Sequence, residues 1–96
     1  MTAEWKSFVL PDRVEAIAGS GLHAFLLAQQ TSPVRLSAAA LRRVDTRLVY
    51  YLIAVARDWA HRGVPFVIAD VAAPQAAILR QTGVTPALLP WQEAGA

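Results

Sequence analysis

Cysteine is absent from this chain, which excludes both a disulfide framework and a thiolate metal site. The two histidines, His23 and His61, are isolated and have no partners at metal-ligand spacing, so we expect no metal and no cofactor. The longest apolar run, Leu48 to Ala56, is too short for a membrane span of about 20 residues. The N-terminus also lacks the basic and apolar segments of a secretory signal. These absences predict a cytoplasmic protein without direct membrane insertion.

Charged residues are scarce as well, at 17% of the chain, and the net charge is only +2. This small surplus of arginine is far from the charge density of a nucleic-acid-binding protein, so we expect no nucleic-acid partner. Apolar residues reach 55%, which argues against disorder. A chain of 96 residues suits one core, and we expect a single domain over residues 1–96.

The first part of the chain predicts two strands with a helix between them. Ser7 to Leu10 is expected to form an edge strand, because proline follows it and cannot donate to a sheet ladder. Gly19-Ser20-Gly21 indicates a turn with Ser20 as N-cap, and a helix is expected from about Gly21 to Gln30. A brief strand is expected at Val34–Leu36, and a turn of α-helix or 3₁₀-helix at Ala38–Arg43.

The middle of the chain carries the clearest helical pattern. Its apolar stripe is formed by Leu48, Leu52, Val55 and Trp59, widened by Val49, Ile53, Ala56 and Ala60. Gly63 is expected to end this helix, and Pro65–Ala69 then predicts a buried strand parallel to the strand at Val34–Leu36.

The last third predicts one more helix and little else. A helix is expected over Pro74–Gln81, with Ala77 and Ile78 facing inward and Gly83 ending it. Thr85–Leu89 is expected to form a short strand or turn, and Trp91–Ala96 a frayed tail. Together these elements predict an α/β fold: a small mixed sheet with helices packed mainly on one face.

The order of these elements resembles the STAS family, the domain of bacterial anti-sigma factor antagonists and of segments of sulfate transporters. The resemblance covers about Val34 to Leu89, and its matching residues are Arg35-Leu36-Ser37, Val44-Asp45-Thr46-Arg47-Leu48, Gly63, Phe66-Val67-Ile68 and Gly83-Val84. Arg35 replaces the aspartate of the family's first motif, and Leu48 replaces a glycine. The short N-terminal region is similar to that of the abbreviated STAS proteins encoded with bacterial chemotaxis components.

The resemblance implies a STAS-like fold and a non-enzymatic regulatory role in a bacterial signalling pathway, with Thr46 as a phosphorylation site. A phosphate there would add a charge of roughly −1.5 to −2 at a helix start, near Arg42, Arg43 and Arg47. The alternative is that Thr46 is the N-cap of the helix, and both roles are compatible. The resemblance implies that Asp45 shapes the same loop, and as a local acceptor it is expected to bond backbone N–H groups or Arg43.

A docking surface for a protein partner is expected on the loop and the exposed face of the following helix. Its residues are Arg43, Asp45, Thr46, Arg47, Tyr50, Tyr51, Ala54 and Asp58. At least one of the adjacent tyrosines must point away from the apolar stripe, and exposed tyrosine beside arginine is typical of an interface. The expected partner is a kinase or anti-sigma factor, or a chemotaxis component. Two alternatives remain: the ATPase of a lipid-transport ABC transporter, and a bound nucleotide or other small ligand.

Overall fold

The computed structural model describes residues 4–14 and 21–95. Over these residues the chain forms β1 (Lys6–Val9), α1 (Gly21–Ala28), β2 (Val34–Ser37), α2 (Thr46–His61), β3 (Phe66–Val71), α3 (Ala73–Gln81) and β4 (Trp91–Glu93). The expected N-cap at Ser20 lies outside the described residues. The strand and helix order expected from the sequence is confirmed from β1 to α3, and β4 is an addition to it.

The described strands form one sheet in the order β1-β2-β3-β4, and every neighbouring pair is parallel. The expectation of a mixed sheet is therefore wrong. The reason lies in the connections, because a helix stands between each pair of successive strands and returns the chain to the same end of the sheet. The expected edge position of β1 and the parallel pairing of β2 with β3 are confirmed.

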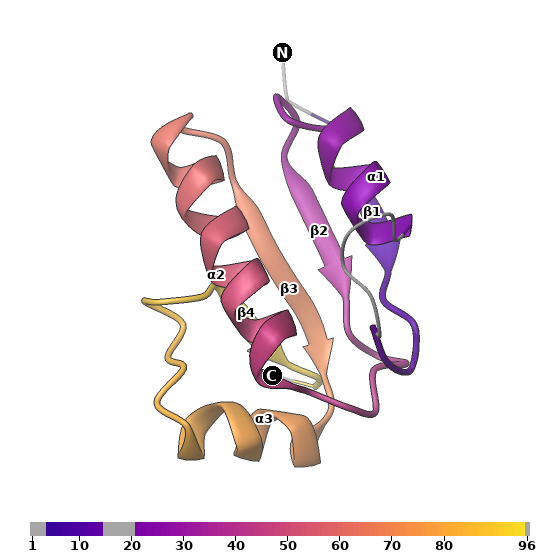
Figure 1. Ribbon diagram of the computed structural model, residues 1–96, viewed down its shortest axis with the longest axis vertical. Coiled ribbons are helices and arrows are strands. Elements are labelled where there is room, and N and C mark those ends of the chain that lie inside the picture. Colours follow the sequence, from indigo (N-terminus) through magenta and orange to yellow (C-terminus); the bar gives the residue numbers. More distant parts are fainter. Residues whose placement is uncertain (1–3, 15–20, 96) are drawn as a thin grey trace.

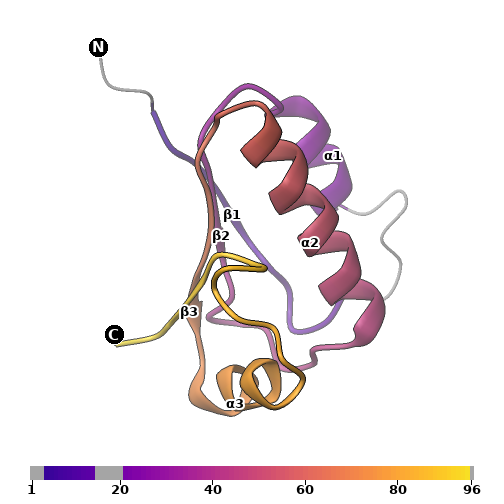
Figure 2. The ribbon, with the colours of Figure 1, turned by 90° about the vertical axis from the view of Figure 1, so that its left-hand side faces the viewer.

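Helices α1 and α2 lie side by side over one face of the sheet, and α3 lies across one end of it (Figures 1 and 2). No described helix covers the other face (Figure 2). This agrees with the expectation that helices pack mainly on one face.

The core lies between this sheet and α2. Val34 and Leu36 in β2 are fully buried, while Arg35 between them is exposed, as expected for a strand with one covered face. The stripe of α2 expected from the sequence is buried at Leu48, Leu52, Val55 and Trp59. Ala60 is exposed and does not belong to the stripe. In addition, the indole N–H of Trp59 donates to the carbonyl of Ser32 at 2.9 Å, which ties α2 to the start of β2.

Helix ends follow the sequence pattern closely. Gly63 and Gly83 have φ of +70° and +79°, a conformation in which a side chain would be strained, and each comes immediately after the C-cap residue of its helix, Arg62 for α2 and Thr82 for α3. Ala38–Arg43 was expected to form a turn of α-helix or 3₁₀-helix, and it contains neither. A single turn closes there instead, with the N–H of Leu41 donating to the carbonyl of Ala38 at 3.1 Å.

The end of the chain differs most from the expectation. The frayed tail predicted at Trp91–Ala96 contains β4, which pairs with β3. Trp91 is only 6% exposed, and its indole N–H donates to the carbonyl of Val84 at 2.8 Å. The pairing has an irregular register between Ile68 and Val71, where Asp70 has a positive φ of 60°. Among the described residues, no helix has the length and apolar character needed to cross a membrane.

Candidate partner-binding site

The start of α2 is fixed by Asp45. This residue has extended backbone angles (φ −112°, ψ 165°), and its Oδ1 accepts a hydrogen bond from the N–H of Leu48 at 2.8 Å. Asp45 is therefore the N-cap, and the alternative that placed the cap at Thr46 is wrong. Thr46 is already the first helical residue, and it is exposed. The expectation that Asp45 bonds a backbone N–H is confirmed.

The loop before α2 is held from two sides. The N–H groups of Arg42 and Arg43 both donate to the carbonyl of Asp12, at 2.7 and 3.1 Å. The buried side chain of Gln75 in α3 donates to the carbonyl of Arg42 at 2.9 Å. These bonds connect the loop to the segment after β1 and to α3. They hold the backbone in place just before α2 begins.

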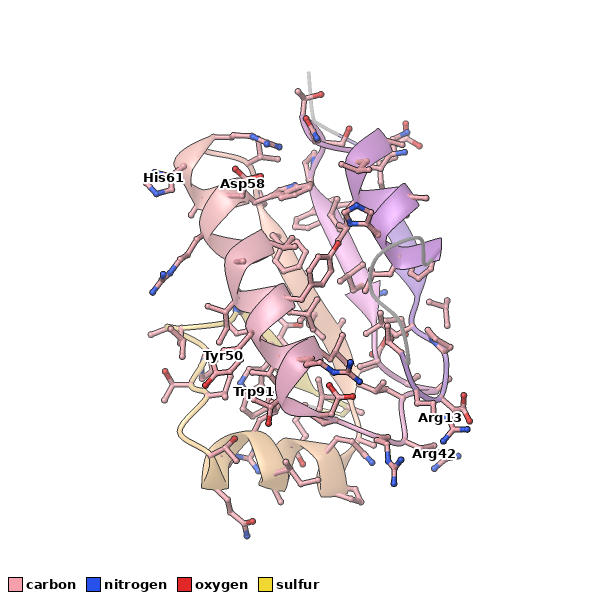
Figure 3. The ribbon with its side chains drawn as sticks, viewed as in Figure 1. Arg13, Arg42, Tyr50, Asp58, His61 and Trp91 are labelled. Carbon is pink, nitrogen blue, oxygen red and sulfur yellow. The ribbon has the colours of Figure 1, made fainter. Side chains whose placement is uncertain are left out.

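A groove lies beside the N-terminal half of α2, between that helix, α3 and the segment before β4. We refer to it as the α2–α3 groove; its volume is about 310 Å³ and it is lined by Val44, Asp45, Thr46, Val49, Tyr50, Ile53, Ile78, Thr82, Val84 and Leu88. Three of its large side chains are exposed: Tyr50 by 69%, Leu88 by 41% and Ile78 by 39%. Figure 3 shows Tyr50 pointing away from α2 toward this side of the molecule. The site is thus an open apolar hollow with Tyr50 at its rim.

The arginines near Thr46 lie around a different hollow. Arg13, Arg43 and Arg47 line a space of about 260 Å³ together with Val14 and Asp45, and Thr46 does not line it. Asp45 is common to this hollow and to the α2–α3 groove. Arg43 and Arg47 form no ion pair with any described residue. The sequence placed the arginines and Thr46 in one cluster, whereas the structure separates them on two sides of the cap.

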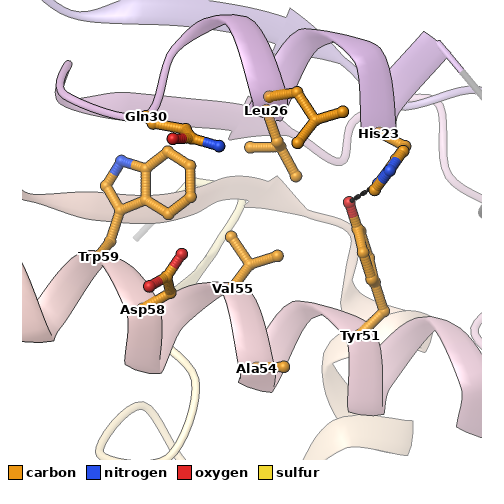
Figure 4. A pocket seen from close by; sticks show the side chains of 9 residues that line it. His23, Leu26, Gln30, Tyr51, Ala54, Val55, Asp58 and Trp59 are labelled. Carbon is orange, nitrogen blue, oxygen red and sulfur yellow. Dashed lines mark hydrogen bonds between the residues drawn. The ribbon is translucent and has the colours of Figure 1, made fainter.

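A second groove separates α1 from α2, and we call it the α1–α2 groove (Figure 4). It has a volume of about 280 Å³, and its lining includes Tyr51, Ala54 and Asp58. The hydroxyl of Tyr51 lies 3.1 Å from Nδ1 of His23, and burial raises the pKa of Tyr51 above its usual value of 10.0. Asp58 pairs with Arg62 at 2.7 Å. Two polar side chains of this groove, Tyr51 and Asp58, are therefore already partnered within the chain.

The predicted docking surface is consequently divided by α2. Tyr50 and Thr46 face the α2–α3 groove, whereas Tyr51, Ala54 and Asp58 face the α1–α2 groove. The expectation that at least one tyrosine points outward is confirmed by Tyr50. The sequence missed the far wall of the α2–α3 groove, since Leu88 was placed only in an undefined strand or turn. Ile78 was expected to face inward, and its 39% exposure corrects this.

Within residues 4–14 and 21–95, no three His, Cys, Asp or Glu side chains gather in a way that could hold a metal ion. Comparison with protein-family models, curated proteins and solved structures finds no match to this chain. The STAS resemblance therefore depends on the sequence motifs alone, and membership of that family remains a prediction.

Proposed function

We propose that this chain is a non-enzymatic regulatory domain that binds a protein partner through the α2–α3 groove. The observation that carries the proposal is the position of Tyr50, a large aromatic side chain that is 69% exposed at the rim of an apolar hollow. Tyrosine is enriched among the residues that dominate the binding energy of protein interfaces, and Tyr50 has Ile78 and Leu88 as exposed apolar neighbours across the groove.

The two helices that form the walls of the groove support the same proposal. One wall belongs to α2, whose start is capped by Asp45, and another to α3, which is bonded to the loop before α2 through Gln75. A binding surface on helices fixed in this way loses little conformational entropy when a partner docks. The α2–α3 groove would therefore already have its bound shape before a partner docks.

Thr46 offers a means of regulation at the same site. It is exposed and lines the groove at the start of α2, so phosphorylation would place a charge of roughly −1.5 to −2 against the docked partner. Thr46→Glu is then expected to weaken partner binding, while Thr46→Ala retains it. An unchanged protein mass after incubation with ATP and the cognate kinase would remove phosphorylation from the proposal.

The STAS resemblance suggests a cytoplasmic, bacterial setting for this interaction. The partner would be a switch kinase or anti-sigma factor, or a chemotaxis component; the alternative is the ATPase of a lipid-transport ABC transporter. These partners differ in mass and sequence, so identification of the protein that co-purifies with the chain from its native cell distinguishes them. A nucleotide-binding role predicts instead a rise in melting temperature with a nucleotide panel.

The decisive experiment compares two aspartate substitutions on α2. Tyr50→Asp introduces a charge at the α2–α3 groove, and Ala54→Asp introduces the same charge at the α1–α2 groove. We expect Tyr50→Asp to abolish co-purification of the partner and Ala54→Asp to retain it. Tyr50 is exposed, so its substitution should change the free energy of unfolding by no more than about 0.5 kcal/mol. Full retention of the partner by folded Tyr50→Asp would refute the proposal.

A further inference from the structure

We propose that the hollow lined by Arg13, Arg43 and Arg47 binds a phosphate group, carried either by a small phosphorylated compound or by a phosphorylated side chain of another protein. We call it the arginine hollow; its other described lining residues are Val14 and Asp45, and its volume is about 260 Å³. This site is separate from the α2–α3 groove, and it does not depend on the docking function proposed above.

The three arginines come from separate segments that the fold brings together. Arg13 follows β1, Arg43 lies in the loop between β2 and α2, and Arg47 belongs to the first turn of α2. The carbonyl of Asp12 accepts from the N–H of Arg43 at 3.1 Å, which ties the first two segments to each other. Ligands of parallel α/β sheets commonly bind outside the carboxyl ends of the strands, and both segments follow such ends. The arginine hollow therefore lies at the end of the sheet where folds of this class bind ligands.

Arg43 and Arg47 supply the positive charge for which the hollow has no internal partner. Both are exposed, and neither forms an ion pair with a described residue. A guanidinium group presents a planar fork of donors that matches the oxygens of a phosphate. A phosphate monoester carries roughly −1.5 to −2 charges at neutral pH, so one phosphate balances these two arginines. Arg13 already has an interaction within the chain, and the proposal does not require its charge to be free.

Asp45 is the acid among the described lining residues, and it opposes an anion. Its carboxylate stays charged, while its Oδ1 accepts from the N–H of Leu48 at 2.8 Å. This charge lowers the positive potential of the hollow but does not reverse it, because three guanidinium groups line the hollow with one carboxylate. Since Asp45 already caps α2, the helix end itself is given no part in binding the phosphate.

The lining also narrows the kind of ligand. None of its described residues is aromatic, so a nucleobase has no ring on which to stack, and the recognised group is the phosphate itself. Thr46 lines the α2–α3 groove and not the arginine hollow, so a phosphate on Thr46 of the same chain is not the expected occupant.

Titration of the intact chain with inorganic phosphate at constant ionic strength tests the site, with backbone amide NMR as the readout. We expect saturable shifts centred on Arg43, Asp45 and Arg47, with a dissociation constant on the order of 1 mM, and no saturable shifts with acetate. A phosphoserine peptide and its unphosphorylated form distinguish the two sources. Tighter binding of the phosphopeptide than of inorganic phosphate assigns the site to a phosphorylated protein, and equal or weaker binding assigns it to small phosphorylated compounds.

Substitutions of opposite sign identify the residues responsible. Arg43→Gln and Arg47→Gln should each weaken phosphate binding about tenfold. Asp45→Asn removes the opposing charge, retains an acceptor for the helix cap, and should strengthen binding about threefold. The matched control is Arg57→Gln, because Arg57 is an exposed arginine of α2 that has no ion pair with described residues and does not line the hollow; we expect a change of less than about twofold. An absence of saturable shifts up to about 20 mM phosphate, or equal weakening by Arg57→Gln, would overturn the site.

Discussion

At the scale of single residues, Asp45 has the most direct effect on the site, because one side-chain hydrogen bond fixes where α2 begins. Asp45→Ala removes the acceptor for the N–H of Leu48 and should lower the free energy of unfolding by about 1 kcal/mol. Asp45→Asn retains an acceptor and should recover most of this loss. Urea denaturation of both variants measures the difference. Thr46→Ala serves as control and should change stability by less than about 0.5 kcal/mol, since Thr46 is exposed. A larger loss in Thr46→Ala than in Asp45→Ala would contradict the assignment of the cap.

Tyr51 links α1 to α2 and gives stability a dependence on alkaline pH. Burial raises the pKa of Tyr51 above 10.0, so the folded chain retains the phenolic proton at a pH where the unfolded chain loses it. The resulting stability is fully present below pH 10.0 and is lost as pH rises from there through the folded pKa. Tyr51→Phe lacks this titration and also loses the contact with His23, at a cost of about 1 kcal/mol.

The measurement for Tyr51 is the difference in the free energy of unfolding between wild type and Tyr51→Phe, at pH 8 and at a pH above 10.0. We expect the advantage of the wild type to shrink at the higher pH. Titration of other groups affects both proteins alike, so it cancels in the difference. An advantage that stays constant with pH would show that Tyr51 is not desolvated.

At the scale of elements, the sequence predicted α2 and β3 well because their burial is periodic and their ends have chemical markers. Leu48, Leu52 and Val55 repeat at helical spacing, and Gly63 supplies the positive φ that ends the helix. The mixed sheet was predicted wrongly because only the pairing of β2 with β3 had been assigned a direction, and the short strands β1 and β4 carry no local signal of theirs. The sequence placed Tyr50 and Tyr51 outside the apolar stripe of α2. It could not assign them to separate grooves, because the opposite walls belong to α3 for Tyr50 and to α1 for Tyr51 and are brought there by tertiary packing.

The short element β4 was missed because its signal is not local. Trp91–Glu93 is too short for a recognisable alternation, and its pairing with β3 begins only after the chain has returned from α3. Two features of the structure show that this segment is not frayed, the burial of Trp91 and its hydrogen bond to the carbonyl of Val84. Both exist only in the folded chain. The far wall of the α2–α3 groove, at Leu88, belongs to the same returning segment and was missed for the same reason.

Trp91 provides the test of whether β4 is part of the folded unit. Trp91 is only 6% exposed, so Trp91→Ala would leave a cavity where the indole ring was. Large-to-small substitutions of this kind lower the free energy of unfolding by about 3 to 5 kcal/mol. Trp91→Phe keeps most of the packing and loses the bond to Val84, at a cost of about 1 kcal/mol. Trp5→Ala is the matched control, since Trp5 is 47% exposed and should cost no more than about 0.5 kcal/mol. Equal, small effects of Trp91→Ala and Trp5→Ala in chemical denaturation would support the frayed tail instead.

At the scale of the whole molecule, the one-sided arrangement of helices gives the sheet two different faces and an open edge. The helices lie on one side of the sheet only (Figure 2). Val34 and Leu36 are buried on the covered face, whereas Arg35 points to the other face and pairs with Asp70 at 3.3 Å. Asp70 also accepts from the hydroxyl of Ser37 at 3.3 Å, so this carboxylate connects β3 to two side chains of β2 on the uncovered face. α2 stands between two grooves on the covered face of the sheet. A partner bound at the α2–α3 groove, as proposed above, would therefore contact α2 and α3 and not the uncovered face of the sheet.

The open edge at β1 makes a prediction for hydrogen exchange that involves no substitution. The N–H groups of Lys6 and Leu10 donate to β2 and its flanks, to the carbonyls of Pro33 at 2.8 Å and Ser37 at 2.9 Å. In a parallel ladder successive N–H groups alternate between the neighbour and the outside, so the N–H groups of Ser7 and Val9 point away from the sheet. We expect the amides of Ser7 and Val9 to exchange quickly and the amide of Leu10 slowly, because exchange of a bonded amide requires local opening.

The central β2–β3 ladder should be the most protected, since β2 and β3 each have strands on both sides. Residue-resolved exchange by NMR decides this: uniform protection along β1 would mean that its edge is covered, by a second copy or by another segment of the chain.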